Sequence, residues 1–395
     1  MIPEIRKEFN SNFTSEKYEA LYQYLREKSG ISPDFRLSES PIFLPQDFKE
    51  KLFQASESII EQISQIPKDV LQKAVPKELN VPNETNSTEF LVIDYGICTD
   101  KDQNLSPQLI ELQGFPSLYA FQPVLKDAYM ELYPFLSSLE KETKSTKEKG
   151  VWLKEVVLEG HPAENVVLLE IFPQEQKTRI DFFLTEKITG ISTVCLTEVK
   201  SKGKQLFYEK NGELIQIKRI YNRVIFDELS QRKDLTLDFE FSKDWDVEWI
   251  PHPNWFFMIS KYILPRLKGP FIPESYFADS FPCDQKPNDY VLKPLFSFAG
   301  SGVNLNPTRQ DIEQISDPQN YILQKKVAYA PLFEDINGEK SKAEIRMLYL
   351  WNNHSRSLEL FDYIVRMTKS QMANVNFNKK DAIWIGSSAI FFEEK

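Results

Sequence analysis

A lysine followed by a loop of small residues is the first feature of this sequence that could do chemistry. Lys293 ends the apolar run 290–292, typical of a buried strand, and the loop after it holds Ser297, Gly300, Ser301 and Gly302. Small residues let backbone N–H groups approach an anion closely, and a lysine beside them supplies a point charge for phosphate. In the Walker loop the lysine follows the glycines, whereas here it precedes them. The stretch therefore indicates a phosphate site of another type, with an ordinary strand and Gly-Ser turn as the alternative.

Two carboxylates stand inside apolar runs far upstream. FLVIDYGICTD (90–100) predicts a strand carrying Asp94, and QLIELQGFPSLYAF (108–121) predicts a second strand carrying Glu111. Because a buried carboxylate without a partner is unfavourable, each needs a cation or a metal ion. Gln113 follows Glu111 by two residues and so lies on the same strand face. The alternative is a pair of edge-strand acids that face solvent.

Four arginines also lie in apolar strands. Arg219 and Arg223, in RIYNRVIF, are near the end of a strand, where α/β sheets present ligand groups, and a structural salt bridge is the alternative. Arg346 and Arg366 lie inside strands and need anionic partners. The acids close to them in the sequence are Glu344, Glu359 and Asp362.

The elements that must position these residues follow from periodicity and turn signals. Residues 1 to about 80 predict mainly helices that form a packing layer. A helix at 123–142 leads into a charged linker, KETKSTKEKG, at 141–150. The apolar runs 166–171 and 193–199 predict parallel-type strands around a helix, and Asn211-Gly212 predicts a hairpin tip. Beyond them we expect one amphipathic helix at 254–269, a strand at 321–327, and an antiparallel pair at 342–352 and 357–369.

Length and composition limit the class of protein. The chain has 395 residues, enough for two or three domains, with 41% hydrophobic and 27% charged residues. A net charge of −10 argues against nucleic-acid and anionic-membrane partners, and no apolar run approaches the ~20 residues of a membrane helix. The N-terminal segment has no signal-peptide pattern, and three scattered cysteines and three distant histidines predict neither disulfides nor a zinc site. We therefore expect a cytoplasmic protein.

In this order the pieces resemble the circularly permuted ATP-grasp group, which includes eukaryotic-type glutathione synthetases and glutathionylspermidine synthases. The resemblance covers about residues 88–395 and rests on the order of four pieces: the acidic strand, the E-x-N-like strand, the substrate domain, and the lysine with its loop. It implies a mixed α/β and α+β fold, an ATP-grasp fold in permuted order. The implied division is an N-terminal helical region at 1–87, metal-ligand strands at 88–160, an inserted small α/β substrate domain at 161–270 and a nucleotide-binding part at 271–395.

The resemblance also implies ATP and Mg²⁺ as cofactors and gives roles to residues. Lys293 would bind the nucleotide phosphates under the loop of Ser297, Gly300, Ser301 and Gly302. The strand that would hold adenine is formed by Gln324, Lys325, Lys326 and Val327, with backbone groups of Lys325 and Val327 at the adenine edge. The metal positions would be Glu111 and Gln113, with Asp94 close behind. Arg219 and Arg366 would meet the substrate or the transferred phosphate, and Asn374 and Asn376 could close the phosphate end.

The implied activity is an ATP-dependent carboxylate–amine ligase that works through an acyl phosphate. Its partners would be small carboxylate and amine substrates, and members of the group are often homodimers. Gln113 stands where the pattern has asparagine, and the arginine usual before the acidic strand residue is absent. These departures leave open a non-catalytic ATP-grasp protein, and a phosphotransferase with another acceptor is a further alternative. The ligase interpretation requires Lys293 and Glu111 to face one nucleotide.

Overall fold

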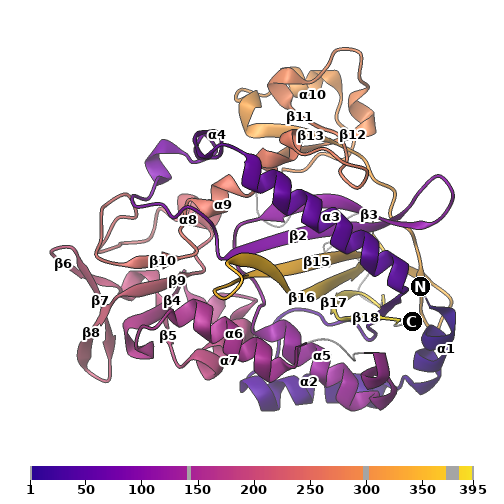
Figure 1. The fold of residues 1–395 in the computed structure, drawn as a ribbon, viewed down its shortest axis with the longest axis horizontal. Coiled ribbons are helices and arrows are strands. Elements are labelled where there is room, and N and C mark those ends of the chain that lie inside the picture. The colour runs from indigo at the N-terminus through magenta and orange to yellow at the C-terminus, as the bar shows by residue number, and fades with distance from the viewer. Residues whose placement is uncertain (1, 140–143, 297–301, 371–381, 394–395) are drawn as a thin grey trace.

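A six-stranded antiparallel sheet forms the centre of the protein. This computed structural model describes residues 2–139, 144–296, 302–370 and 382–393, and its central strands run in the order β17, β16, β15, β2 and β3, with β14 paired to β15. The bounds are β2 Phe90–Thr99, β3 Leu105–Gln113, β14 Phe333–Glu334, β15 Lys340–Asn352, β16 Ser357–Thr368 and β17 Gly386–Ser388. Segments from the first third and the last fifth of the chain thus share one sheet (Figure 1).

The register of this sheet brings the predicted carboxylates and arginines onto one face. Asp94 in β2 pairs with Arg346 in β15 on one side and with Glu111 in β3 on the other. Glu344, two residues before Arg346, pairs with Arg366 in β16. Directly opposed residues share a face of a sheet, so these five side chains lie together. Asp94 is on an interior strand and only 1% exposed, so the solvent-facing alternative is wrong for it.

Helices of the N-terminal region cover the other face. Helix α3 (Gln46–Gln65) lies across β2 and β3 in Figure 1, and its Ser56 hydroxyl lies 2.9 Å from the hydroxyl of Tyr95. Ser56 Oγ also lies 3.2 Å from the sulfur of Met347 in β15. Helices α1 (Pro3–Asn12), α2 (Ser15–Ser29) and α4 (Lys68–Gln72) complete this region. Strand β1 (Ile42–Leu44) pairs in parallel with β18 (Ile390–Phe392).

A parallel sheet forms a second layer, in the order β10, β9, β4 and β5. Its strands are β4 Val166–Glu170, β5 Ser192–Cys195, β9 Arg219–Asn222 and β10 Glu248–Ile250, so the predicted parallel strands are present. Helix α6 (Thr146–Leu158) and helix α7 (Arg179–Thr189) belong to this part. The hairpin of β7 (Gln205–Lys210) and β8 (Glu213–Ile217), with β6 (Lys200–Lys202), turns at Asn211-Gly212 with positive φ of 54° and 84°, as predicted.

The charged linker predicted at 141–150 is wrong for its described part, because α6 begins there. Ser145 caps α6, since its hydroxyl accepts from the Glu148 N–H while the Glu148 carboxylate accepts from the Ser145 N–H. This reciprocal capping box converts a run of charged residues into a helix start. The buried side of α6 includes Trp152, Leu153 and Val156.

A small antiparallel sheet carries the predicted phosphate lysine. Its strands β11 (Ser275–Phe277), β13 (Tyr321–Lys325) and β12 (Tyr290–Pro294) lie in that order, and Figure 1 shows them with α10 (Arg309–Glu313) at one end of the molecule. A core separate from the main one supports them. It consists of Ala278, Phe281, Tyr290, Leu292, Ile312 and Leu323.

The segment predicted as one helix at 254–269 is broken into two short pieces. Helix α9 (Trp255–Met258) ends before Ser260, whose hydroxyl accepts from the Tyr262 N–H and starts the 3-10 helix η6 (Lys261–Arg266). The strand predicted over 108–121 likewise ends at Gln113, and α5 (Phe121–Leu132) follows a turn. The other helices of the described chain longer than one turn are α8 (Phe226–Gln231) and the 3-10 helix η2 (Pro134–Leu139). Among described residues, no helix is both long and apolar enough to cross a membrane.

Candidate functional site

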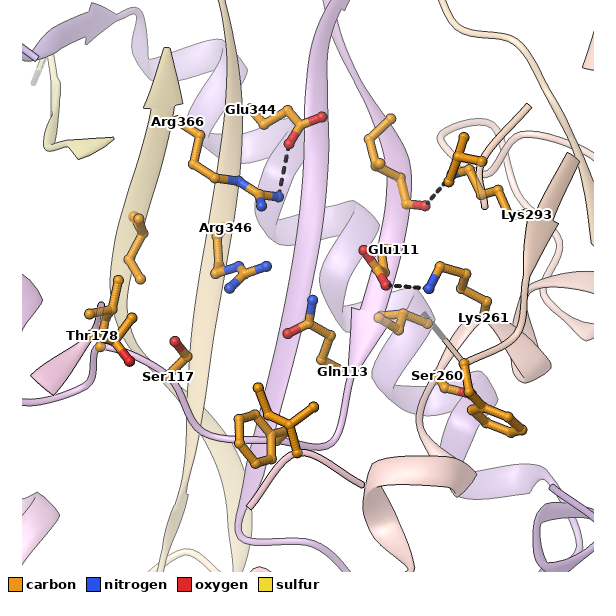
Figure 2. A pocket seen from close by; sticks show the side chains of 18 of the residues that line it. Glu111, Gln113, Ser117, Thr178, Ser260, Lys261, Lys293, Glu344, Arg346 and Arg366 are labelled. Atoms are coloured by element: carbon orange, nitrogen blue, oxygen red, sulfur yellow. Dashed lines mark hydrogen bonds and ion pairs between the residues drawn. The ribbon is translucent and has the colours of Figure 1, made fainter. Parts of the chain in front are cut away.

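One large cavity lies where the three layers meet. Its volume is about 1,210 Å³, and it is lined by β3, β12, β13, β15 and β16 and by the loops that follow β4 and β9. Lys293 and Glu111 both line it, and Lys293 Nζ lies 3.3 Å from the carbonyl oxygen of Ile110. Figure 2 shows the charged side chains of the sheet pointing into this space. The strands therefore bring the two predicted halves of a site to one cavity.

Asp94 is held between two arginines at the base of the cavity. Arg346 donates to both carboxylate oxygens of Asp94, at 2.8 Å from Nε and 2.7 Å from Nη2, and Arg366 Nη2 donates to it at 2.7 Å. Burial alone would raise the pKa of Asp94, but the two guanidiniums hold that pKa below its ordinary value. Of the two predicted kinds of partner, cation or metal ion, the structure gives Asp94 the cation. Its oxygens are occupied, and it is a counter-ion rather than an open metal ligand.

Arg366 joins this pair to a second carboxylate. Its Nη2 lies 2.8 Å from Glu344 Oε2, and Tyr329 donates to Glu344 Oε1. Burial would lower the pKa of Arg366, but Asp94 and Glu344 raise it further than burial lowers it. Its Nε is buried and has no hydrogen-bond partner among the described residues. Arg366 is therefore a fixed cation with donor capacity left for a ligand.

Glu111 is paired with a lysine that sequence reasoning did not single out. Lys261, the first residue of η6, places its Nζ 2.9 Å from Glu111 Oε1 (Figure 2). The Lys261 side chain is 8% exposed and that of Glu111 26% exposed. No sequence signal marked Lys261, because it lay inside a stretch predicted as a continuous helix. Gln113 lines the cavity two residues further along β3.

Lys293 is anchored at the end of β12 by its neighbour on β13. Its Nζ donates to Gln324 Oε1 at 2.5 Å, and Gln324 Nε2 donates to the Leu109 carbonyl at 3.1 Å. Burial lowers the pKa of Lys293 to about 8, although Glu111 acts in the opposite direction. Gln324 is thus buried as a brace for Lys293 rather than presented to an adenine ring.

The other predicted nucleotide positions are only partly in the cavity. Lys325, Lys326 and Val327 line it, but the Lys325 N–H donates to the Glu274 carbonyl at 2.8 Å and so is not free to bind adenine. Lys326 Nζ donates to Asn306 Oδ1 at 3.1 Å. Gly302 has a φ of 72° and is exposed to solvent, and it does not line the cavity. Ser297, Gly300, Ser301, Asn374 and Asn376 lie outside the described residues.

Arg219 does not join this site. It is the first residue of β9, at the edge of the parallel sheet opposite to the carboxyl ends, and pairs with Glu159 at 2.5 Å and Glu248 at 2.6 Å beside a second cavity of about 590 Å³. Arg219 therefore forms the structural salt bridge that was the alternative interpretation of its sequence pattern. Arg223, just after β9, lines the large cavity instead, because ligands meet the carboxyl ends of parallel strands.

Arg223 and Glu170 also line the cavity, from the carboxyl ends of β9 and β4. Arg223 is 2% exposed, and its Nε and Nη1 have no hydrogen-bond partner among the described residues. Its guanidinium lies over the rings of Phe115 and Phe182, at 5.0 and 5.3 Å. Burial raises the pKa of Glu170 to about 8 against the opposing charge of Arg223. Glu170 ends the apolar run VVLLE, a signal that could have marked it.

The donor set of the predicted metal positions does not fit Mg²⁺. Mg²⁺ takes oxygen ligands in octahedral geometry at about 2.1 Å. Of the predicted positions, Asp94 is held by two arginines, Glu111 is paired with Lys261, and Gln113 could offer only a neutral amide oxygen. The neighbouring Glu344 is shared by Arg366 and Tyr329. Across the described ranges, no group of three acidic, histidine or cysteine side chains could hold a metal ion.

Comparison with known proteins supports the fold at a distance. No protein-family model matches this sequence, and no curated protein matches it. Among solved structures, a glutathione synthetase-like effector from Globodera pallida, in its apo form, is similar with a TM-score of 0.60. The match covers 96% of both chains at 11% sequence identity. The chain therefore has a mixed α/β fold with several sheets, distantly similar to a glutathione synthetase-like protein.

Proposed function

We propose that this chain is an ATP-dependent carboxylate–amine ligase with an ATP-grasp fold in permuted order. The observation that carries the proposal is the convergence of four cations on one cavity between two sheets. These cations are Lys261, Lys293, Arg346 and Arg366. They would neutralise a triphosphate, and apolar lining residues could contact the base. Those apolar residues are Val291, Leu295, Val303, Leu305 and Val327.

The chemistry asks mainly for positioning and charge neutralisation. A carboxylate oxygen of the substrate attacks the γ-phosphorus, the bond to the β,γ-bridging oxygen breaks, and ADP leaves. An amine then attacks the acyl carbon, the amide bond forms, phosphate leaves, and the amine loses a proton to water. Arg366 Nε has no hydrogen-bond partner among the described residues and could donate to the transferred phosphoryl group. The Lys293 ammonium, which donates to Gln324, would supply a second positive charge in the same cavity.

The part of the cavity lined by Arg223 and Glu170 offers a place for the acceptor substrate. Arg223 is buried, and its Nε and Nη1 have no hydrogen-bond partner among the described residues, so either could donate a charge-assisted hydrogen bond to a carboxylate. Glu170 beside it could accept a hydrogen bond from an amino group. An amino acid or a short peptide carries both groups, and so it is the substrate class that we propose.

ADP release tests the proposal. Full-length protein should release ADP from ATP when the right amino acid, peptide or polyamine is supplied, and hydroxylamine should trap a hydroxamate. Arg366→Met should reduce the rate at least 100-fold, because it removes a cation aimed at the reacting phosphate. Arg219→Met is the control, since Arg219 is also held in ion pairs with carboxylates but lies outside the large cavity. Equal losses in both variants would contradict the proposed site.

A second candidate is a protein that binds ATP or a related anion without turnover. The ion pair of Lys261 with Glu111 favours it, because this pair occupies the carboxylate that a catalytic metal would need. Tight ATP binding by calorimetry, with no substrate-stimulated ADP release and no hydroxamate, would support this candidate over the ligase.

A further inference from the structure

The backbone that carries Lys261 is fixed in the cavity wall by hydrogen bonds on both sides of the residue. It begins η6 directly after Ser260, whose hydroxyl accepts from the Tyr262 N–H at 3.2 Å. The preceding turn is fixed to the end of β3, because the Gly114 N–H donates to the Ile259 carbonyl at 2.8 Å. This backbone contact holds the start of η6 beside Glu111, three residues before Gly114.

Glycine is needed for that contact. A Cβ on Gly114 would lie 2.4 Å from the Trp255 carbonyl oxygen, closer than real Cβ atoms come, and 3.0 Å from Ile259 Cβ, tighter than most real contacts. Glycine at position 114, just after β3, therefore allows α9 and η6 to pack against the strand. The consequence is a lysine ammonium held 2.9 Å from the carboxylate of Glu111.

We propose that the Lys261 ammonium takes the place of a divalent cation in this cavity, so that the phosphates of a nucleotide bind there without a metal ion. The identity of the ligand as a nucleotide rests on the proposed function. In Figure 2, Arg346 and Arg366 lie on one side of Glu111, and Lys261 and Lys293 lie on the other. A phosphate chain that enters this space meets cations from both sides.

The local charge agrees with this assignment. Among the groups around Glu111, the four cations face three carboxylates, Asp94, Glu111 and Glu344, an excess of one positive charge in this set of seven. A dication on Glu111 would stand next to the Lys261 ammonium and close to Lys293, and like charges at such distances repel strongly in a partly buried site. To place the metal on Glu111 Oε1, the ion pair of Lys261 and Glu111 would have to break.

Calorimetry on the full-length wild-type protein tests the inference directly. ATP and inorganic tripolyphosphate are titrated in EDTA and, separately, in excess MgCl₂. We expect ATP to bind in EDTA with a Kd no more than threefold weaker than in MgCl₂. Binding of ATP in MgCl₂ alone would overturn the inference and leave the nucleotide site standing.

The tripolyphosphate arm separates the inference from the proposed function. Tripolyphosphate binding in EDTA without any ATP binding would support the metal-free anion site and overturn the nucleotide function. Failure of both ligands in EDTA overturns the inference, and failure of both in MgCl₂ as well overturns the proposed function with it.

Variants identify the residue. Lys261→Met should weaken ATP binding in EDTA at least tenfold, whereas Lys261→Arg should keep it within threefold, because the charge is retained. Lys149→Met is the matched control: Lys149 is 8% exposed like Lys261 and pairs with Asp362 at 2.8 Å, but it lies outside the cavity. Unchanged ATP binding in folded Lys261→Met would overturn the inference.

Discussion

Asp94 shows what a single buried carboxylate can organise. It takes three hydrogen bonds from Arg346 and Arg366, one guanidinium approaching each side of the carboxylate. Because both arginines also face the cavity, their orientation depends on this acid. The carboxylate therefore fixes two cations that would otherwise be free to turn toward solvent.

Removing Arg346 should destabilise the fold. Arg346→Met leaves Asp94 buried with one partner, and losing one member of a buried charged pair costs about 3–5 kcal/mol. Urea unfolding measures the change. Arg179→Met, which breaks the exposed pair of Arg179 and Asp34, is the control and should cost less than about 1 kcal/mol. A loss in Arg346→Met as small as in the control would show that Asp94 is not held as described.

Glu170 predicts a pH dependence of stability. Its folded pKa of about 8 lies above its ordinary value of 4.5, so the folded protein holds a proton that the unfolded chain releases. Stability should therefore fall as pH rises from about 4.5 to 8, by at most about 1.4 kcal/mol per pH unit from this group.

Comparison with Glu170→Gln isolates that contribution. The amide stays neutral, so the variant should lose less stability than the wild type between pH 5 and pH 8 when urea unfolding is measured at each pH. Parallel curves for the two proteins would contradict the raised pKa.

At the scale of elements, the contact between the end of β3 and the segment that follows α9 determines where Lys261 lies relative to Glu111. Gly114→Ala should destabilise the protein by about 1–3 kcal/mol, because its Cβ would overlap the Trp255 carbonyl. Gly150→Ala, in α6, is the opposite control: its Cβ would meet Ile188 Cγ2 at 3.6 Å, and alanine favours a helix by up to about 1 kcal/mol. Thermal and urea unfolding of both variants measure the difference. A stable Gly114→Ala would mean that α9 can move away from β3.

Elements with strong local signals were predictable, and those decided by long-range contacts were not. The hairpin at Asn211-Gly212 and the pair of β15 and β16 follow from turn chemistry and alternation. The helix predicted at 254–269 breaks at Ser260 because the Ile259 carbonyl accepts a hydrogen bond from the Gly114 N–H, just after β3 and far away in the sequence. The start of α6 was missed because its capping box, Ser145 and Glu148, lies in a run of charged residues that favours a linker.

The site shows the same division. Sequence reasoning singled out Asp94, Glu111, Lys293 and Arg366, since charged groups within or next to apolar strands stand out. It could not give their pairings, because the register that opposes Asp94 to Arg346 joins strands about 250 residues apart. The resemblance gave the substrate role to Arg219 and not to Arg223. The bounds of β9 place the two arginines at opposite ends of that strand, with Arg223 on the side of the cavity.

At the scale of the whole molecule, the small sheet should open more easily than the rest. Its separate core has six buried hydrophobic residues, whereas the main core spans the other layers. Hydrogen exchange measured by mass spectrometry should be faster in β12 and β13 than in β15 and β16. ATP should slow exchange in β12 and β13, because it would bridge them to the central sheet. Equal protection in both sheets would contradict this order.

The antiparallel pairing of β2 with β15 has a consequence for synthesis. The ribosome makes β2 first, and its partner emerges roughly 250 residues later, on the order of 10 to 50 s at ordinary rates of translation. During that interval β2 presents one unpaired edge and an almost wholly apolar sequence to the cell. A growing chain of this protein is thus a natural client for chaperones until β15 leaves the exit tunnel and closes the sheet.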